Sequence, residues 1–224
     1  MSYQIAIDGP AGAGKSTIAR RVAEKKGYIY VDTGAMYRAM AYFLLMEGVN
    51  PVDTAAIEEK CQEADITIRY ENGEQVVLLN GENVNAFLRT EEVGNMASHH
   101  SSANPKVRER LTALQKELAR TNNVVMDGRD IGTCVLPDAD VKVYLTASTG
   151  VRARRRFDEL QARGVSCDIE QIEKDIASRD EEDMNRPIAP LKRAEDAVLI
   201  DSSEMSIEEV VKAILELCRD LRGR

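Results

Sequence analysis

Residues 9–16 have the sequence Gly9-Pro10-Ala11-Gly12-Ala13-Gly14-Lys15-Ser16. This stretch matches G-x-x-x-x-G-K-[ST], a phosphate-binding loop that joins a buried strand to a helix. The apolar run Tyr3 to Ile7 precedes it, and an amphipathic pattern follows it to about Lys26. Glycines let the backbone wrap closely around phosphate oxygens, and a helix N-terminus favours negative charge. The sequence therefore predicts a P-loop within a strand–helix–strand unit, whose second strand, Tyr28 to Val31, is parallel to the first.

The loop also predicts how a nucleoside triphosphate is held. Lys15 is expected to reach the β- and γ-phosphates, and the hydroxyl of Ser16 is a candidate ligand for Mg²⁺. Asp127, which ends the apolar strand Val124–Met126, is a second candidate for Mg²⁺. The expected ATP-binding residues are Gly9, Pro10, Ala11, Gly12, Ala13, Gly14, Lys15, Ser16 and Thr17. A P-loop alone leaves GTPases, motor ATPases and small-molecule kinases open, but the chain has no N-K-x-D tetrapeptide of the GTPase type.

Composition limits the possible partners. The chain has 224 residues and a formal net charge of -8, which argues against a nucleic-acid duplex as partner but not against a nucleotide. Its four cysteines are far apart, without a zinc or disulfide pattern, which favours a reducing, cytoplasmic location. We find neither a signal peptide nor an apolar run of 18 residues, and we therefore expect no membrane partner.

The rest of the chain alternates between helical and strand patterns, with one exception. Ile66–Tyr70 alternates in polarity, Asn72-Gly73 is a strong hairpin turn, and Gln75–Leu79 is apolar again, which predicts a small antiparallel insert from Asp65 to about Leu88. Further strands are expected at 124–127, 141–145 and 197–200, and helices at 33–47, from 53, 91–101, 105–120, 151–163, 168–183 and 206–221.

Two groups of charged residues are candidates for phosphate chemistry. Arg152, Arg154, Arg155 and Arg156 lie close together on one expected helix, and Arg179 and Arg186 follow in an acidic stretch. A solvated helix face explains any single arginine, whereas together they are typical of a mobile lid. The segment Asp127-Gly128-Arg129-Asp130 ends a strand, where ligands of parallel sheets bind, although its acids could also be capping or salt-bridging groups.

The chain resembles bacterial cytidylate kinases over nearly its whole length. The resemblance is carried by the P-loop and four further segments: Asp32-Thr33-Gly34-Ala35-Met36-Tyr37-Arg38, Arg89-Thr90-Glu91-Glu92-Val93, Asp127-Gly128-Arg129-Asp130-Ile131-Gly132-Thr133 and Arg179-Asp180 to Arg186. It implies an α/β fold: a P-loop core with a parallel sheet flanked by helices, a small antiparallel β insert in the lobe that binds the nucleoside monophosphate, and a helical lid. The expected boundaries within the single kinase chain 1–224 are core 1–34, 104–150 and 190–224, lobe about 35–103 and lid about 151–189.

The resemblance also implies an activity, the transfer of a phosphoryl group from ATP·Mg²⁺ to CMP or dCMP by a monomeric enzyme. Arg38, Arg129 and Arg186 would hold the acceptor phosphate. Cytosine would be read by Thr33, Arg108 and Asp130, and the sugar by Ser98, Arg179 and Asp183. Tyr37 completes the expected substrate-binding set. The expected catalytic residues are Lys15, Arg155 and Arg156.

Three other classes of protein remain alternatives. A kinase for shikimate or gluconate would keep the P-loop without a cytosine-reading set. A non-catalytic ATP-binding module would bind ATP without forming ADP rapidly. An RNA-binding function is disfavoured by the negative net charge of the chain and by the lack of RNA-binding motifs.

Overall fold

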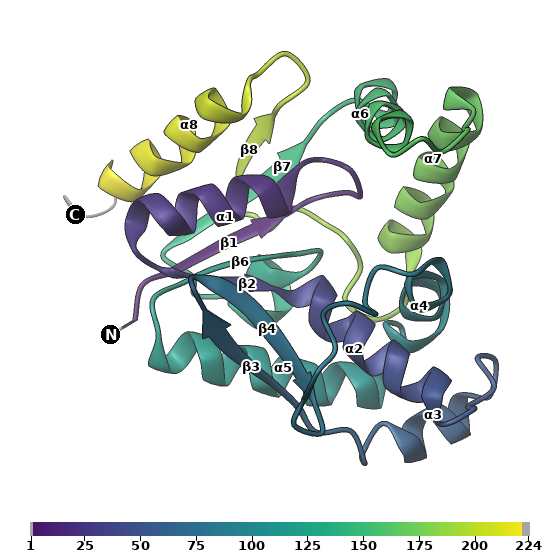
Figure 1. Cartoon of the computed structure of the whole chain (residues 1–224). Coiled ribbons are helices and arrows are strands. Elements are labelled where there is room, and N and C mark those ends of the chain that lie inside the picture. Colours follow the sequence, from purple (N-terminus) through teal and green to yellow (C-terminus); the bar gives the residue numbers. More distant parts are fainter. Residues whose placement is uncertain (1, 221–224) are drawn as a thin grey trace. The chain divides into compact units, whose positions relative to one another are not determined.

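The computed structural model describes residues 2–220, and its contacts divide the chain into two compact units (Figure 1). The first unit comprises Ile29–Asn122, and the second comprises Tyr3–Tyr28 and the chain from Asn123 onward. The second unit thus carries both the P-loop and the arginine-rich segments. The functional boundaries of core, lobe and lid stay a prediction.

The second unit is built on a parallel sheet. Its strands are β1 (Gln4–Asp8), β6 (Val124–Gly128), β7 (Val141–Thr146) and β8 (Val198–Asp201), in the order β6-β1-β7-β8. The central strands are buried on both faces, which is why they are continuous apolar runs. The register places Ile7 of β1 opposite Asp127 of β6, so the segments that follow the two strands emerge at the same edge.

Helices cover this sheet. Helix α1 (Lys15–Lys26) packs on β1 and β6, and α8 (Ile207–Asp220) packs on α1 and β7. Helices α6 (Thr149–Ala162) and α7 (Ile169–Asn185) lie side by side (Figure 1). The predicted α/β class with a parallel sheet flanked by helices is confirmed. The expected end of the last helix, Leu221, lies outside the described residues.

One element of the second unit is not predicted from the sequence. A π-helical turn, η2 (Ile131–Val135), follows β6 and contacts β1 and β6. It contains the second half of the D-G-R-D-I-G-T segment, in which helical periodicity cannot develop because the turn is so short.

The first unit packs helices around α2. Its non-sheet elements are α2 (Thr33–Met46), α3 (Thr54–Lys60), α4 (Glu91–Asn95), η1 (Met96–Ser101) and α5 (Pro105–Thr121). Helix α2 contacts α4, η1 and α5, and α3 contacts α5. The predicted helix 91–101 is in fact two elements, because the chain changes to i→i+5 hydrogen bonds from Met96, as in the bond from Ser102 N to Ala97 O (3.1 Å).

The predicted antiparallel insert also forms within this unit. It consists of β3 (Ile66–Glu71), β4 (Glu74–Leu79) and the two-residue β5 (Glu82–Asn83). Asn72 and Gly73 have φ angles of 52° and 82°, the positive values that a tight hairpin turn of this kind requires. The Asn-Gly signal therefore identifies the turn correctly.

A side chain of the insert holds the end of β2 (Ile29–Asp32). Gln75 Oε1 accepts a hydrogen bond from the N–H of Asp32 (2.9 Å), and Gln75 Nε2 donates to the carbonyl oxygen of Asp32 (3.2 Å). Nearby, the hydroxyl of Tyr70 donates to the carbonyl of Tyr30 (3.0 Å). The hairpin is thus attached to the backbone that leads into α2.

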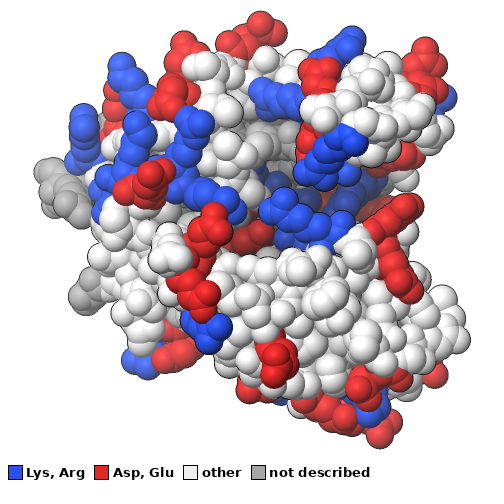
Figure 2. All heavy atoms as spheres, in the orientation of Figure 1, with Lys and Arg blue, Asp and Glu red and all other residues white. Residues whose placement is uncertain are grey.

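The surface carries both signs of charge. Figure 2 shows lysine and arginine interspersed with aspartate and glutamate on the face in view. Within residues 2–220, no helix combines the length and the apolar character needed to cross a membrane. All four cysteines are free thiols, with Cys61 and Cys218 buried and Cys134 exposed.

Candidate active site

The P-loop adopts a conformation that depends on glycine. Gly9 has φ 151° and Gly14, the residue that precedes α1, has φ 85°. A Cβ at Gly9 would lie 1.9 Å from the carbonyl oxygen of Leu145, so the loop leaves the sheet where only glycine fits. Thr17, the last of the expected ATP-binding residues, lies on α1 with an exposed side chain.

Lys15 lies buried within the loop that it is expected to serve. Its Nζ donates a hydrogen bond to the carbonyl of Pro10 (2.8 Å). Burial, followed by the positive charge of Arg129, lowers the pKa of Lys15 to about 7, against the opposing effect of Asp127. The ammonium is thus poorly solvated, and an anion placed beside it would restore its charge.

This pKa predicts a pH-dependent binding of ATP. We expect binding to take up protons at about pH 8, where the phosphates of ATP are fully ionised and the free Lys15 is largely neutral. Affinity should be greatest below about pH 7 and should fall as pH rises above it. Calorimetry in two buffers of different ionisation enthalpy measures the uptake, with Lys15→Met as the control. Equal heats in both buffers would contradict the prediction.

Ser16 and Asp127 are brought together by the sheet. Ser16 Oγ donates a hydrogen bond to Asp127 Oδ2 (2.9 Å), and Asp127 is buried at the end of β6. A hydroxyl next to a carboxylate suits Mg²⁺, which is commonly held by one or two protein oxygens together with substrate phosphates. Among the described residues there is no cluster of three or more His, Cys, Asp or Glu side chains that could hold a metal by itself.

Asp8 is a structural acid that the sequence analysis did not select. Its carboxylate accepts hydrogen bonds from the N–H groups of Ile131 (2.8 Å) and Gly132 (2.7 Å), and burial raises its pKa to about 6. It therefore fixes the segment after Arg129 and Asp130. The available signal was its position as the acid that ends β1, directly before the P-loop.

Four of the five expected acceptor-binding residues of the second unit form one ionic cluster: Arg129, Asp130, Asp183 and Arg186. Arg129 Nε donates to Asp183 Oδ2 (2.8 Å), and Arg186 lies 3.7 Å from both Asp183 and Asp130. Asp130 is buried, whereas Arg179 is exposed on α7. Two of the three arginines expected to bind the acceptor phosphate, Arg129 and Arg186, thus meet at the carboxylate of Asp183. A phosphate could compete with this carboxylate for both arginines.

The two arginines expected to be catalytic lie on α6 with other partners. Arg155 donates to the carbonyl of Ser202 (2.8 Å), and Arg156 pairs with Glu159 of its own helix (2.9 Å). The exposed ion pair between Arg156 and Glu159 contributes little to stability, whereas the bond of Arg155 to Ser202 is part-buried. The arginine of α6 that contacts the P-loop is Arg152, whose Nη1 donates to the carbonyl of Ala11 (2.9 Å).

The first unit brings most of its expected substrate residues together around α2. Arg38 Nη2 lies 3.3 Å from Asp32 Oδ2, and the Arg38 Nε is buried without a hydrogen-bond partner among residues 2–220. The guanidinium of Arg108 lies over the ring of Tyr37, 5.6 Å from its centre, and Thr33 is buried at the start of the helix.

Ser98 is placed by the π-helical element rather than by α2. It lies on η1, which packs against α2, and its hydroxyl donates to the carbonyl of Gly94 (2.8 Å). Because the hydroxyl proton of Ser98 is used in this bond, the Ser98 oxygen would act towards a ligand chiefly as a hydrogen-bond acceptor.

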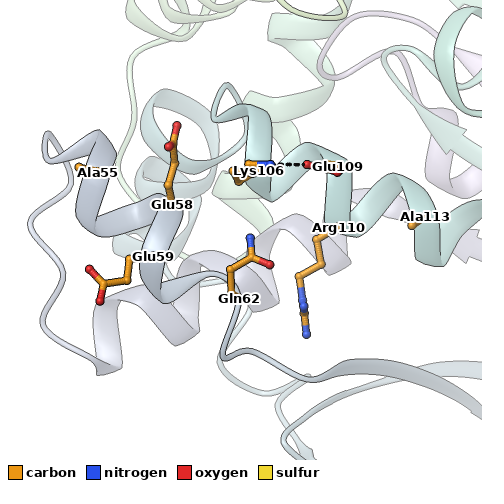
Figure 3. Close-up of a pocket in the computed structure, with 8 residues that line it drawn as sticks. All are labelled: Ala55, Glu58, Glu59, Gln62, Lys106, Glu109, Arg110 and Ala113. Atoms are coloured by element: carbon orange, nitrogen blue, oxygen red, sulfur yellow. Dashed lines mark hydrogen bonds and ion pairs between the residues drawn. The ribbon is translucent and has the colours of Figure 1, made fainter.

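A separate pocket of the first unit lies between α3 and α5. It has a volume of about 700 Å³, and Figure 3 shows its lining residues, among which Lys106 and Glu109 form an ion pair (2.9 Å). None of the expected substrate residues lines it. Its lining carries charges of both signs, and because it holds none of the expected substrate residues we do not assign the pocket to the nucleotides.

Comparison with known proteins decides between the kinases that this geometry allows. The family model described as cytidylate kinase matches residues 5–220. The chain belongs to the cytidylate kinase family. This confirms the resemblance seen in its motifs, and the match includes both the P-loop and the D-G-R-D-I-G-T segment.

Individual cytidylate kinases are similar over almost the entire chain. One from Shouchella clausii is 50% identical over 218 residues, which cover 97% of this chain and 96% of the relative. One from Caldicellulosiruptor bescii is 50% identical over 213 residues, with 95% and 94% covered. A solved structure of an uncharacterized protein from Eubacterium ventriosum shares the fold, with a TM-score of 0.54, 11% identity and full coverage of both chains.

For a cytidylate kinase with this sequence, the structure singles out two residues from these charged segments. Arg152 is buried and contacts the P-loop, and Asp180 is its buried partner on α7 (2.6 Å). Both residues are present in the charged runs of the sequence, but a run of arginines does not show which one faces inward.

Proposed function

We propose that this chain transfers the γ-phosphoryl group of ATP to CMP and dCMP. The supporting observation is that β1 and β6 pair in parallel, so the P-loop with Lys15 and the segment with Arg129 follow neighbouring strands at the same edge of the sheet. The charge of Arg129 accordingly contributes to the lowered pKa of Lys15. Phosphoryl transfer needs a phosphate-binding cation for each nucleotide, because two phosphate groups must approach each other against their mutual repulsion. A nucleotide switch would require only the cation of the donor site, Lys15.

On the donor side, we assign ATP to residues 9–17. The N–H groups of the loop bind the phosphates, and Lys15 neutralises charge on the β- and γ-phosphates. Ser16 and Asp127 would hold Mg²⁺, which supplies charge neutralisation between the phosphates when bound. Their hydrogen bond at 2.9 Å supports this assignment.

On the acceptor side, arginines are assigned to the phosphate because a guanidinium fork matches its oxygens. The proposed phosphate-binding residues are Arg38, Arg129 and Arg186. Cytosine presents an amine donor beside two acceptors, which suits a carboxylate or hydroxyl together with an arginine. We therefore assign the base to Thr33, Arg108 and Asp130, with Tyr37 packed against Arg108. The sugar is assigned to Ser98, Arg179 and Asp183.

The chemical step needs no general base. An oxygen of the CMP phosphate attacks the γ-phosphorus, a new P–O bond forms, the bond to the β-phosphate oxygen breaks, and ADP leaves. The attacking phosphate is already largely ionised near neutral pH, since its second pKa is about 6. Lys15 stabilises the charge that spreads over the transferring group. We propose that Arg155 and Arg156 leave Ser202 and Glu159 to join it as part of a lid formed by residues 151–189.

The proposal is tested first by substrate preference. ADP release with ATP·Mg²⁺ is measured against CMP, dCMP, UMP, AMP, GMP and shikimate. Rapid turnover with CMP and dCMP and little with purine monophosphates is the expected result. Activity on another acceptor alone would overturn the cytidylate assignment while leaving the P-loop argument intact, and silence with all six would favour a non-catalytic ATP-binding module.

Asp130→Ala tests how cytosine is selected. We expect it to weaken the preference for CMP over UMP and AMP by about one to three orders of magnitude, since a buried polar group that reads the base is lost. The kcat/KM values of the three acceptors are compared for the variant and the wild type, with KM for ATP as an internal control. An unchanged preference would show that Asp130 only supports Arg186.

The remaining properties are extensions of this proposal. We propose a cytoplasmic monomer that acts in pyrimidine nucleotide metabolism. Four free thiols support a reducing compartment, because none of them is engaged in a disulfide.

A further inference from the structure

Arg152 is unusual among the arginines of α6 because it is buried, with 4% of its surface exposed. Each of its nitrogens has an oxygen partner. Nε donates to the carbonyl of Ala147 (2.9 Å), Nη1 to the carbonyl of Ala11 (2.9 Å), and Nη2 to Asp180 Oδ2 (2.6 Å) and to Thr149 Oγ1 (3.4 Å). One guanidinium thus connects the end of β7, the P-loop and α7.

The contact with Ala11 orients the P-loop backbone. In a trans peptide the C=O of one residue and the N–H of the next point in opposite directions. Because the carbonyl of Ala11 points to Arg152, the N–H of Gly12 is turned away from the guanidinium. The stem of Arg152 also packs against the loop at Gly12, where a Cβ would lie 3.4 Å from the Arg152 Cβ.

Asp180 holds Arg152 from the opposite side. Its exposed fraction is 8%, and its second oxygen, Oδ1, is buried with no hydrogen-bond partner in the described chain. A buried pair of this kind is a weak source of net stability, yet removing one partner leaves an uncompensated charge. The position of Arg152 therefore depends on where α7 places Asp180.

Helix α7 also carries residues assigned to the acceptor nucleotide. Arg179 directly precedes Asp180, and Asp183, one turn later, binds Arg129 (2.8 Å). A helix that shifts when the acceptor binds would therefore move Asp180, and with it the guanidinium that orients the P-loop.

We propose that Arg152 is a positioning residue for the P-loop, and that the Arg152–Asp180 pair couples the binding of ATP to the binding of the acceptor nucleotide. The identity of the acceptor rests on the proposed function. Each ligand then favours the position of α7 that suits the other, so the coupling must be equal in both directions.

The test measures coupling rather than activity alone. The affinity for a non-hydrolysable ATP analogue is titrated by calorimetry with and without CMP, for the wild type, Asp180→Asn and Arg152→Lys. Asparagine keeps the shape and one acceptor oxygen but removes the charge, whereas lysine keeps the charge but cannot reach three partners at once. Asp175→Asn is the matched control, since Asp175 is an exposed aspartate of the same helix.

We expect CMP to strengthen binding of the analogue to the wild type about fivefold or more. In Asp180→Asn and Arg152→Lys the factor should fall to about one to two, while Asp175→Asn keeps the full factor. Full coupling in both variants, or no coupling in the wild type, would overturn the proposal. Thermal unfolding identifies a variant that does not fold, and the other then decides.

Failure of the proposed function has a different signature. If the wild type does not turn over CMP, the cytidylate assignment fails, and the positioning role of Arg152 is decided by the analogue alone. In that case Arg152→Lys should weaken its binding about tenfold, because the orientation of the loop is lost. Unchanged affinity would then overturn the positioning role as well.

Discussion

Lys15→Ala should lower kcat by at least about a hundredfold to a thousandfold. The ammonium is buried beside the loop that is proposed to bind the phosphates, and its charge is most needed when negative charge spreads over the transferring group. A low-dielectric setting strengthens this interaction compared with water. Steady-state kinetics with saturating ATP·Mg²⁺ and CMP measures the loss.

A control variant and its melting temperature separate an effect on the reaction from an effect on folding. Lys15→Met fills a similar volume without the charge, so it should lose activity to a similar degree while its melting temperature stays close to that of the wild type. Near-normal kcat in both variants would show that Lys15 serves the loop structure through Pro10 and not the reaction.

Gly9→Ala should have the largest effect on stability. The new Cβ would lie 1.9 Å from the backbone oxygen of Leu145. No rotamer change can relieve this clash, because the position of both atoms is fixed by the backbone. Gly9 also has φ 151°, which strains a residue with a side chain. We expect a loss of more than about 4 kcal/mol in the free energy of unfolding, together with loss of ATP binding.

A matched substitution tests the geometric reason. Gly94 lies in helix α4, and a Cβ there would meet no atom within 4 Å. Gly94→Ala should therefore raise stability by about 0.5–1 kcal/mol, because alanine loses less backbone entropy in a helix. Urea denaturation of both variants measures the difference. Equal, small effects at Gly9 and Gly94 would contradict the close approach of the loop to β7.

The sequence predicts the fold well wherever a short run of residues determines the local backbone conformation. The P-loop, the strands β1 and β6 and the Asn72-Gly73 hairpin follow from apolar runs and from the backbone freedom of glycine and asparagine. The π-helical elements η1 and η2 could not be predicted, since their i→i+5 hydrogen bonds leave no distinct periodicity in five or six residues.

In the candidate site, too, local motifs predict some residues, and long-range contacts decide the others. Motifs identify Lys15, Ser16 and Asp127, and the structure brings the last two within 2.9 Å. The motifs could not single out Arg152 from the neighbouring arginines. Its burial depends on Asp180, a partner on another helix that is distant in the sequence. The roles of all these residues stay predictions that the variants will test.

The link between Gln75 and Asp32 places an unequal constraint on the two positions during evolution. Gln75 uses its side chain, but Asp32 contributes only main-chain N–H and C=O groups. Any residue other than proline at position 32 could keep both bonds, whereas most changes at position 75 remove them. Residue 32 is therefore free to drift as far as the hairpin is concerned, and its conservation among related enzymes would report on its own carboxylate, which caps α2 at Ala35 (2.8 Å) and pairs with Arg38.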